Sequence, residues 1–189
     1  LHLSIRRQRQ MCIRDRYVFW EITSLLSYLL VSYYAERASS RRAAQQALMV
    51  TALGGLTMLM GFILLGRQTG AWTFSDISAY ENFAQTPYVT VAIVLILAGA
   101  LTKSAIVPAH FWLPGAMAAP TPVSAYLHSA AMVKAGIYLV GRLAPSMYEV
   151  ATWHVVVISL GVFTMLLGGW MALKPVSYTH LRAHETDSY

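Results

Sequence analysis

The stretch 88–117, YVTVAIVLILAGALTKSAIVPAHFWLPGAM, decides which kind of fold this chain can adopt, because Lys103 is its only charged residue. A hydrocarbon core about 30 Å thick accommodates about 20 residues of straight helix. This run is therefore too long to cross a membrane once. Pro108 and Pro114 interrupt it, and the stretch predicts a discontinuous helix with irregular backbone at 104–108.

Lys103 is a costly residue at this position. A lysine at the centre of a membrane helix costs roughly 2.5–3.5 kcal/mol on insertion scales. Irregular backbone at that depth is tolerated only where protein or water satisfies the freed N–H and C=O groups. Ion transporters build their sites from this combination of a broken helix and buried polar groups. The alternative is a structural cation that only holds the broken helix in place.

The composition excludes an ordinary soluble domain. The chain is 57% hydrophobic and 12% charged, with a mean hydropathy of +0.51, whereas soluble domains are about 25% charged. Five arginines lie within the first sixteen residues and the other basic residues are scattered, so the net charge of +6 does not indicate nucleic-acid binding. The single cysteine, Cys12, excludes an internal disulfide. No phosphate loop, dinucleotide motif or metal-ligand spacing occurs, so we expect no cofactor and no metal.

The two ends differ from the rest. The strings RRQRQMCIRDR (6–16) and PVSYTHLRAHET (175–186) resemble translated sequencing-adapter read-through, and they are rich in charge. We therefore expect 1–16 and 175–189 to be non-native and to make no specific contacts, and we take 17–174 as the proton-conducting membrane transporter domain, itself a fragment. The alternative is a real basic arm and polar tail.

Five apolar runs predict the architecture. They lie at 17–34, 44–66, 88–117, about 122–143 and 153–173. No heptad repeat and no long strand-like alternation occurs, which argues against a coiled coil and a β-barrel. The sequence thus predicts an all-α polytopic membrane helix bundle of about five transmembrane helices, one of them discontinuous. The small residues of 44–66 indicate close helix packing.

The arginine distribution predicts an orientation. Short cytoplasmic loops carry an excess of lysine and arginine, which places 35–43 in the cytoplasm with Lys174 on the same side. The linkers 67–87 and 144–152 then face outward.

Glu21 is the second candidate for a functional buried charge. With Ser24 and Tyr28 it forms a polar stripe at i, i+3 and i+7, on one helix face. A carboxylate inside a membrane span faces the bundle interior and pairs with another group. We therefore predict that Glu21 approaches Lys103 to ion-pair or single-water distance. The alternatives are a structural salt bridge, a protonated acid, or a position at the membrane interface.

Lys134 and His128 are candidates for a proton path. Lys134 lies near the centre of the 122–143 run, with no acidic residue in that run. His128 precedes it by six residues, so the two side chains are about 120° apart around a helix and are no ligand pair, although a water chain could join them. His128 can equally be a satisfied core residue. His110 and His154 are weaker candidates near the membrane boundaries.

Two stretches resemble a known family. LTKSAIVPAHFWLPGAMAAPTPVSAYLHSAAMVKAGIYLVGRL (101–143) resembles the signature region of the antiporter-like membrane subunits. These include the large A subunits of Mrp-type sodium/proton antiporters and the corresponding subunits of respiratory complex I. FWEITSLLSYLL (19–30) resembles the span that bears the family's pair glutamate. The sequence of these stretches is closer to the Mrp type. The segment SAIVPAH departs from the sequence usual for the broken helix in this family.

The resemblance assigns roles to four residues. By position, Glu21 corresponds to the pair glutamate and Lys103 to the lysine of the broken helix. His128 and Lys134 correspond to members of the relay on the next helix. Such subunits contain a five-helix unit twice, inverted, and this fragment would be the first unit.

The function that this implies is transport rather than enzymatic catalysis. We expect a fragment of one subunit of a multisubunit Mrp-type antiporter in the bacterial plasma membrane, which exchanges inward protons for outward Na⁺ alongside other membrane subunits. One alternative is a proton-pumping membrane subunit of NADH-quinone oxidoreductase or of a related membrane hydrogenase. Another is a structural membrane subunit in which the charges only hold helices together.

The first testable prediction concerns the ends. If the terminal strings derive from adapters, a genomic clone of the same locus will diverge from this sequence before residue 17 and after 174. Sequencing that clone is the measurement. Both strings encoded in frame in genomic DNA would contradict the assignment.

Overall fold

The computed structural model describes residues 12–34, 36–80, 82–117, 119–127 and 132–172. Over these ranges the chain is helical, with one isolated β-bridge between Cys12 and Thr73 and no strand. This confirms the all-α prediction. The helices are α2 (Ile13–Val31), α3 (Ala38–Thr69), α4 (Phe74–Ala79), η1 (Phe83–Gln85), α5 (Val89–Lys103), η2 (Ala109–Phe111), α6 (Trp112–Ala116), α7 (Thr121–Ala125), α8 (Met132–Met147) and α9 (Ala151–Ala172).

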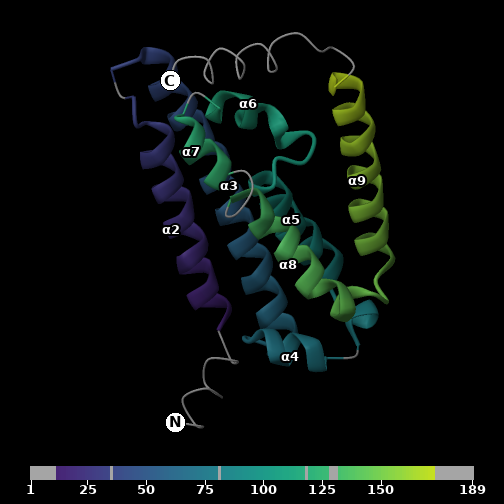
Figure 1. Cartoon of the computed structure of the whole chain (residues 1–189). Helices are drawn as coiled ribbons and strands as arrows, with labels where there is room; N and C mark the ends of the chain where they lie inside the picture. The colour runs from purple at the N-terminus through teal and green to yellow at the C-terminus, as the bar shows by residue number, and fades with distance from the viewer. Residues whose placement is uncertain (1–11, 35, 81, 118, 128–131, 173–189) are drawn as a thin grey trace.

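The long helix α3 lies at the centre of the bundle. It packs against α2 on one side and α5 on another, and α5 in turn contacts α8 and α9 (Figure 1). Small residues bring the α3 and α5 backbones close together, as is usual where helices associate in lipid. A Cβ on Gly61 of α3 would lie 2.8 Å from the Ala92 carbonyl oxygen, and a Cβ on Gly99 of α5 would overlap the Gly54 carbonyl oxygen.

The break predicted at 104–108 is present. The α5 helix ends at Lys103, and the helical path resumes only at η2 and α6. Ala105 adopts a left-handed conformation with φ of 53°, which turns the chain away from the α5 axis. The prediction of a discontinuous helix is therefore confirmed.

Side chains from other elements bond to backbone groups around the break. The Trp112 indole N–H donates to the Thr102 carbonyl oxygen at 3.1 Å. The Val107 amide donates to Thr164 Oγ1 of α9 at 3.2 Å. Broken backbone at membrane depth needs such partners because no water reaches it from the lipid. The break is thus held from both α6 and α9.

The observed helices differ in length from the predicted runs. By length and composition, two described helices could each cross a membrane alone, namely Ala38–Thr69 and Ala151–Met171, while Val89–Lys103 is a shorter apolar helix. The break explains the shortness of α5. The 122–143 run falls on two helices, α7 and α8, with 128–131 outside the described residues.

The connections between helices agree with an alternating topology. Figure 1 shows α4, which follows α3, at the same end of the bundle as the junction of α8 and α9. The end of α2 and the start of α3 lie at the opposite end. The assignment of that end to the cytoplasm stays a prediction.

The expectation that 1–16 make no specific contacts is wrong for residues 12–16. Ile13 is only 5% exposed within the main apolar cluster, and its amide donates to the Trp72 carbonyl oxygen at 3.2 Å. The Arg16 guanidinium lies 4.6 Å from the centre of the Phe74 ring. These contacts form because α2 continues as a helix back to Ile13 and so carries its apolar face to the segment before α4. Residues 1–11 and 173–189 lie outside the described residues, and the non-native origin of both ends stays a prediction.

A second prediction tests the α5–α8 contact. A Cβ on Gly136 of α8 would overlap the Ala100 carbonyl oxygen and Ser104 Oγ, whereas a Cβ on Gly141 of the same helix would meet nothing within 4 Å. We expect Gly136→Ala to destabilise the full-length subunit by roughly 1–3 kcal/mol, the usual cost of overpacking. Gly141→Ala should be neutral or slightly stabilising, because alanine favours a helix over glycine by about 1 kcal/mol. Thermal unfolding in detergent measures both, and equal behaviour of the two variants would contradict the packing described.

Candidate functional site

The site is built around the buried ammonium of Lys103. This last residue of α5 is 0% exposed. Its Nζ donates to the Trp20 carbonyl oxygen at 2.5 Å, to Thr23 Oγ1 at 2.5 Å and to Ser24 Oγ at 3.1 Å. It also lies 4.4 Å from the centre of the Trp20 ring, where a cation is attracted to the π face. The three hydrogen bonds match the three N–H donors of an ammonium group.

Helix periodicity explains how α2 supplies all three oxygens. Positions 20, 23 and 24 are related as i, i+3 and i+4, so they share one face of a helix. Thr23 Oγ1 also donates to the Trp20 carbonyl oxygen at 2.7 Å, and Ser24 Oγ does so at 3.3 Å. Each hydroxyl can therefore accept from Lys103 while donating to the α2 backbone. The result is a compact polar cluster inside an apolar bundle.

The Glu21 carboxylate points toward α3. A Cβ built on Gly55 of α3 would have the three carboxylate atoms of Glu21 as its nearest neighbours. Glu21 Oε1 is buried without a hydrogen-bond partner among the described residues. Position 21 lies about 100° from position 20 and about 60° from position 24 around the helix, so Glu21 lies at the edge of the face that binds Lys103.

Glu21 and Lys103 are thus close in the fold without a direct ion pair between them in the described part of the chain. Lys103 is held by neutral oxygens from the helical turn that carries Glu21, and the two charges interact electrostatically. The direct contact expected from the sequence is not formed. A bridge through a single water stays a prediction.

Lys134, another predicted relay residue, is not brought to this cluster. Lys134 lies in the first turn of α8 and is exposed, while its neighbours Val133 and Gly136 contact α5. His128 lies outside the described residues. Of the weaker candidates, His110 in η2 has a buried Nδ1 without a hydrogen-bond partner, and His154 contacts the Tyr148 carbonyl oxygen at 2.6 Å.

Sequence reasoning missed three contributors to the site. These are the Trp20 carbonyl oxygen, the Thr23 hydroxyl and Gly55. The helical spacing of Trp20 and Thr23 relative to Ser24 was visible in the sequence. Gly55 was assigned to packing alone, because the sequence around a glycine in a membrane helix does not show which side chain packs against it.

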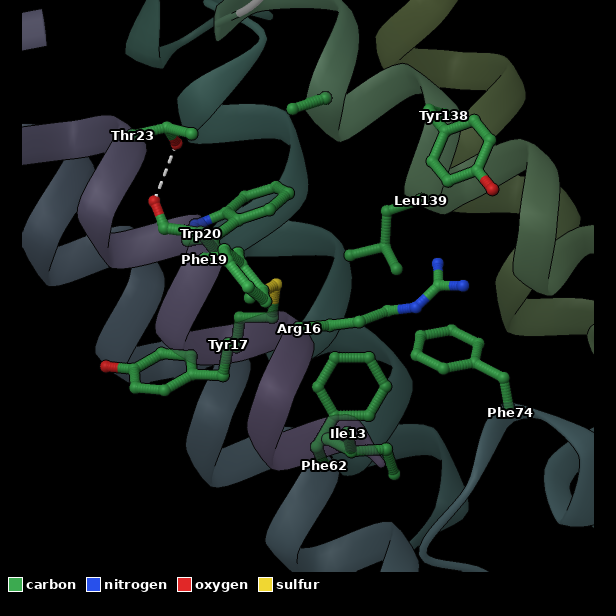
Figure 2. Close-up of a pocket in the computed structure, with 12 residues that line it drawn as sticks. Ile13, Arg16, Tyr17, Phe19, Trp20, Thr23, Phe62, Phe74, Tyr138 and Leu139 are labelled. Atoms are coloured by element: carbon green, nitrogen blue, oxygen red, sulfur yellow. Dashed lines mark hydrogen bonds between the residues drawn. The ribbon is translucent and has the colours of Figure 1, made fainter. Parts of the chain in front are cut away.

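A cavity adjoins the cluster between α2, α3 and α8. It has a volume of about 390 Å³ and is lined by α2 residues Trp20 and Thr23 among mostly apolar side chains. Figure 2 shows the Thr23–Trp20 hydrogen bond at one side of this space, with Leu139 of α8 facing it. Groups of three or more His, Cys, Asp or Glu side chains able to hold a metal are absent from the described residues. Lys103 and Glu21 are titratable side chains, which can bind or release a proton.

Comparison with known proteins gives one matching family. Residues 13–186 match the family described as "NADH:quinone oxidoreductase/Mrp antiporter, TM". The matched range extends into both ends that differ in composition.

Individual relatives agree with this match. The chain is 46% identical over 173 residues to the A subunit of the Na⁺/H⁺ antiporter of Bacillus subtilis, which covers 91% of this chain and 22% of that protein. It is 45% identical over 173 residues to the A/B subunit of a probable K⁺/H⁺ antiporter of Rhizobium meliloti, covering 91% of this chain and 17% of that protein. The solved Mrp complex of a Dietzia species superposes with a TM-score of 0.75 at 41% identity, covering 80% of this chain and 17% of that one. The chain therefore spans about a fifth of the length of the curated relatives it matches.

A third prediction tests the hydrogen bonds to Lys103. Thr23→Val removes an oxygen from a charged donor with little change of shape, and hydrogen bonds to charged groups contribute about 1.5–3 kcal/mol. We expect a loss of that order in the free energy of unfolding of the full-length subunit in mixed micelles. Thr57→Val is the matched control, because Thr57 Oγ1 bonds only to the Gly54 carbonyl oxygen of its own helix, at 2.8 Å. In a Lys103→Met background, Thr23→Val and Thr57→Val should lower the free energy of unfolding by the same amount. If Thr23→Val still lowered it more, Thr23 would be acting independently of the ammonium.

Proposed function

Because the chain belongs to the NADH:quinone oxidoreductase/Mrp antiporter transmembrane family, we propose that it is part of a subunit of a multisubunit cation/proton antiporter. It would lie in the plasma membrane of a bacterium and work beside other membrane subunits. The observation that carries the proposal is the fully buried ammonium of Lys103 at the end of a broken helix, bonded to the turn of α2 that bears Glu21.

The proposed mechanism uses Lys103 as a proton carrier whose charge depends on Glu21. Opposite charges stabilise each other more strongly as they approach in a medium of low polarity. A movement of the break would change the distance between carboxylate and ammonium, and so change how firmly Lys103 holds its proton. The two groups start apart, with Glu21 against α3 and Lys103 on neutral oxygens, which leaves room for such a change.

The proton released by Lys103 would pass toward α8. The Ser104 hydroxyl donates to the Val133 carbonyl oxygen of α8 at 2.7 Å, so the break and the first turn of α8 are in contact. We propose Lys134 in that turn, with His128 before it, as the next members of the relay. The exposure of Lys134 in the described chain supports a position at the surface that another part of the longer subunit would cover.

We propose Na⁺ as the exported cation. The names of the relatives include a Na⁺/H⁺ and a K⁺/H⁺ antiporter at nearly equal identity, so the cation has to be assigned by experiment. Antiport that responds to added Na⁺ and not to added K⁺ supports the proposal. A response to K⁺ alone would replace sodium by potassium while leaving the proton path as proposed.

One alternative comes from the breadth of the family, whose description includes NADH:quinone oxidoreductase. In a proton-pumping subunit of that enzyme or of a membrane hydrogenase, the same buried charges would be driven by redox chemistry elsewhere. Genes for quinone-oxidoreductase subunits next to this locus would favour this alternative. Genes for antiporter subunits there favour exchange.

The fourth prediction separates a proton carrier from a structural cation. In the complete complex, Lys103→Ala and Glu21→Ala should reduce antiport nearly to the level of vesicles that lack the complex, while the subunit still assembles. Lys103→Arg should fail as well, because arginine keeps a positive charge but does not give up its proton in this pH range. Antiport is measured by the collapse of a proton gradient in everted vesicles.

A structural role makes the opposite prediction for Lys103→Arg. A cation that only holds α2 to α5 is preserved by arginine, so transport would stay near the wild-type level. That outcome would eliminate the relay. Immunoblots of the assembled complex control for loss of the protein itself.

A further inference from the structure

The helix α3 carries two adjacent glycines, Gly54 and Gly55, that face two different helices. A Cβ on Gly54 would lie 2.8 Å from the Cβ of Thr102, the residue before Lys103. A Cβ on Gly55 would lie 3.0 Å from Glu21 Cδ, 3.6 Å from Oε2, and closer still to Oε1. Separations under 3.0 Å are essentially never seen for real Cβ atoms. Neither side chain could therefore be added without displacing a neighbour.

Among the described glycines, Gly55 is the one whose close contact is with an ionisable side chain. At Gly61 and Gly99 the nearest atoms include backbone of a facing helix, as expected for helix packing. At Gly55 the three nearest atoms all belong to the Glu21 carboxylate. The missing Cβ therefore creates a notch in α3 that receives this one ionisable group.

We propose that Gly55 is a positioning residue for Glu21, whose notch holds the carboxylate against α3 and sets its separation from Lys103. This inference rests on the proposed function, because the separation matters only if the Glu21 carboxylate changes how firmly Lys103 holds its proton. This positioning role differs from helix packing. The effect of a substitution at Gly55 should depend on whether the side chain at position 21 is long enough to reach the notch.

The chemistry of the carboxylate explains why a notch is needed. Glu21 Oε1 is buried and has no hydrogen-bond partner among the described residues, so hydrogen bonds to that oxygen do not fix its place. The shape of the space on α3 then decides where the group rests. A Cβ at position 55 would expel the carboxylate and change its distance from the ammonium.

The test is a double-mutant cycle in the full-length subunit within its complex, the fifth prediction. Gly55→Ala should reduce antiport by roughly ten- to a hundred-fold, because a displacement of about 1 Å in a reacting group can cost on the order of 10²-fold. Glu21→Asp withdraws the carboxylate by one methylene and by itself should also reduce antiport. In the Glu21→Asp background, Gly55→Ala should have little further effect, because the shorter side chain no longer reaches the notch.

The same cycle is measured by thermal unfolding of the complex. Gly55→Ala should lower the melting temperature in the wild-type background and leave it nearly unchanged in the Glu21→Asp background. This second readout decides the matter where a variant transports too slowly to measure. An equal penalty for Gly55→Ala in both backgrounds, by either readout, overturns the proposal, because the added methyl would then conflict with something other than Glu21.

Gly61→Ala is the matched control on the same helix. Its Cβ would crowd Ile96 and the Ala92 carbonyl oxygen of α5, so it should destabilise both backgrounds equally. The result for Lys103→Arg keeps the two proposals separate. A silent Gly55→Ala with an inactive Lys103→Arg overturns only the positioning role, whereas an active Lys103→Arg overturns the proton relay itself.

Discussion

The need to satisfy one ammonium group inside an apolar bundle governs the arrangement of this chain. Transferring a charge out of water is costly unless it is paired or fully hydrogen-bonded, and Lys103 is completely buried. Its three donors are met by three oxygens of α2, from Trp20, Thr23 and Ser24. This requirement fixes which face of α2 turns toward the end of α5, and through it the direction in which every neighbouring side chain of α2 points.

The break after Lys103 imposes a second requirement on the surrounding helices. A helix that stops inside a membrane leaves carbonyl and amide groups without their usual partners. Here Trp112 of α6 and Thr164 of α9 supply them, while Ser104 ties the turn to α8. Elements that are distant in sequence are therefore joined at the residue that carries the charge. The contact between α5 and α8 combines the Ser104 hydrogen bond with the close packing of Gly136 against Ala100.

The separation of Glu21 from Lys103 makes the distance between the two charges easier to change. A buried pair in direct contact is stable as a unit, and breaking it is costly. Two charges that are each held by other groups, one by neutral oxygens and one by a notch at Gly55, can be brought together or apart at smaller cost. This logic applies to a redox-driven pump as well as to an antiporter. The description of the family names both kinds of protein.

The sequence by itself determined the all-helical membrane class, the break at 104–108 and the burial of Lys103. These features follow from local properties, namely apolar length, proline position and the cost of charge in lipid. Only the tertiary structure decided that Glu21 faces Gly55, that Lys103 binds neutral oxygens, that Lys134 is exposed, and that α2 begins at Ile13. Periodicity states which residues share a face of a helix. It does not state which neighbour that face meets, because this depends on how all the helices pack at once.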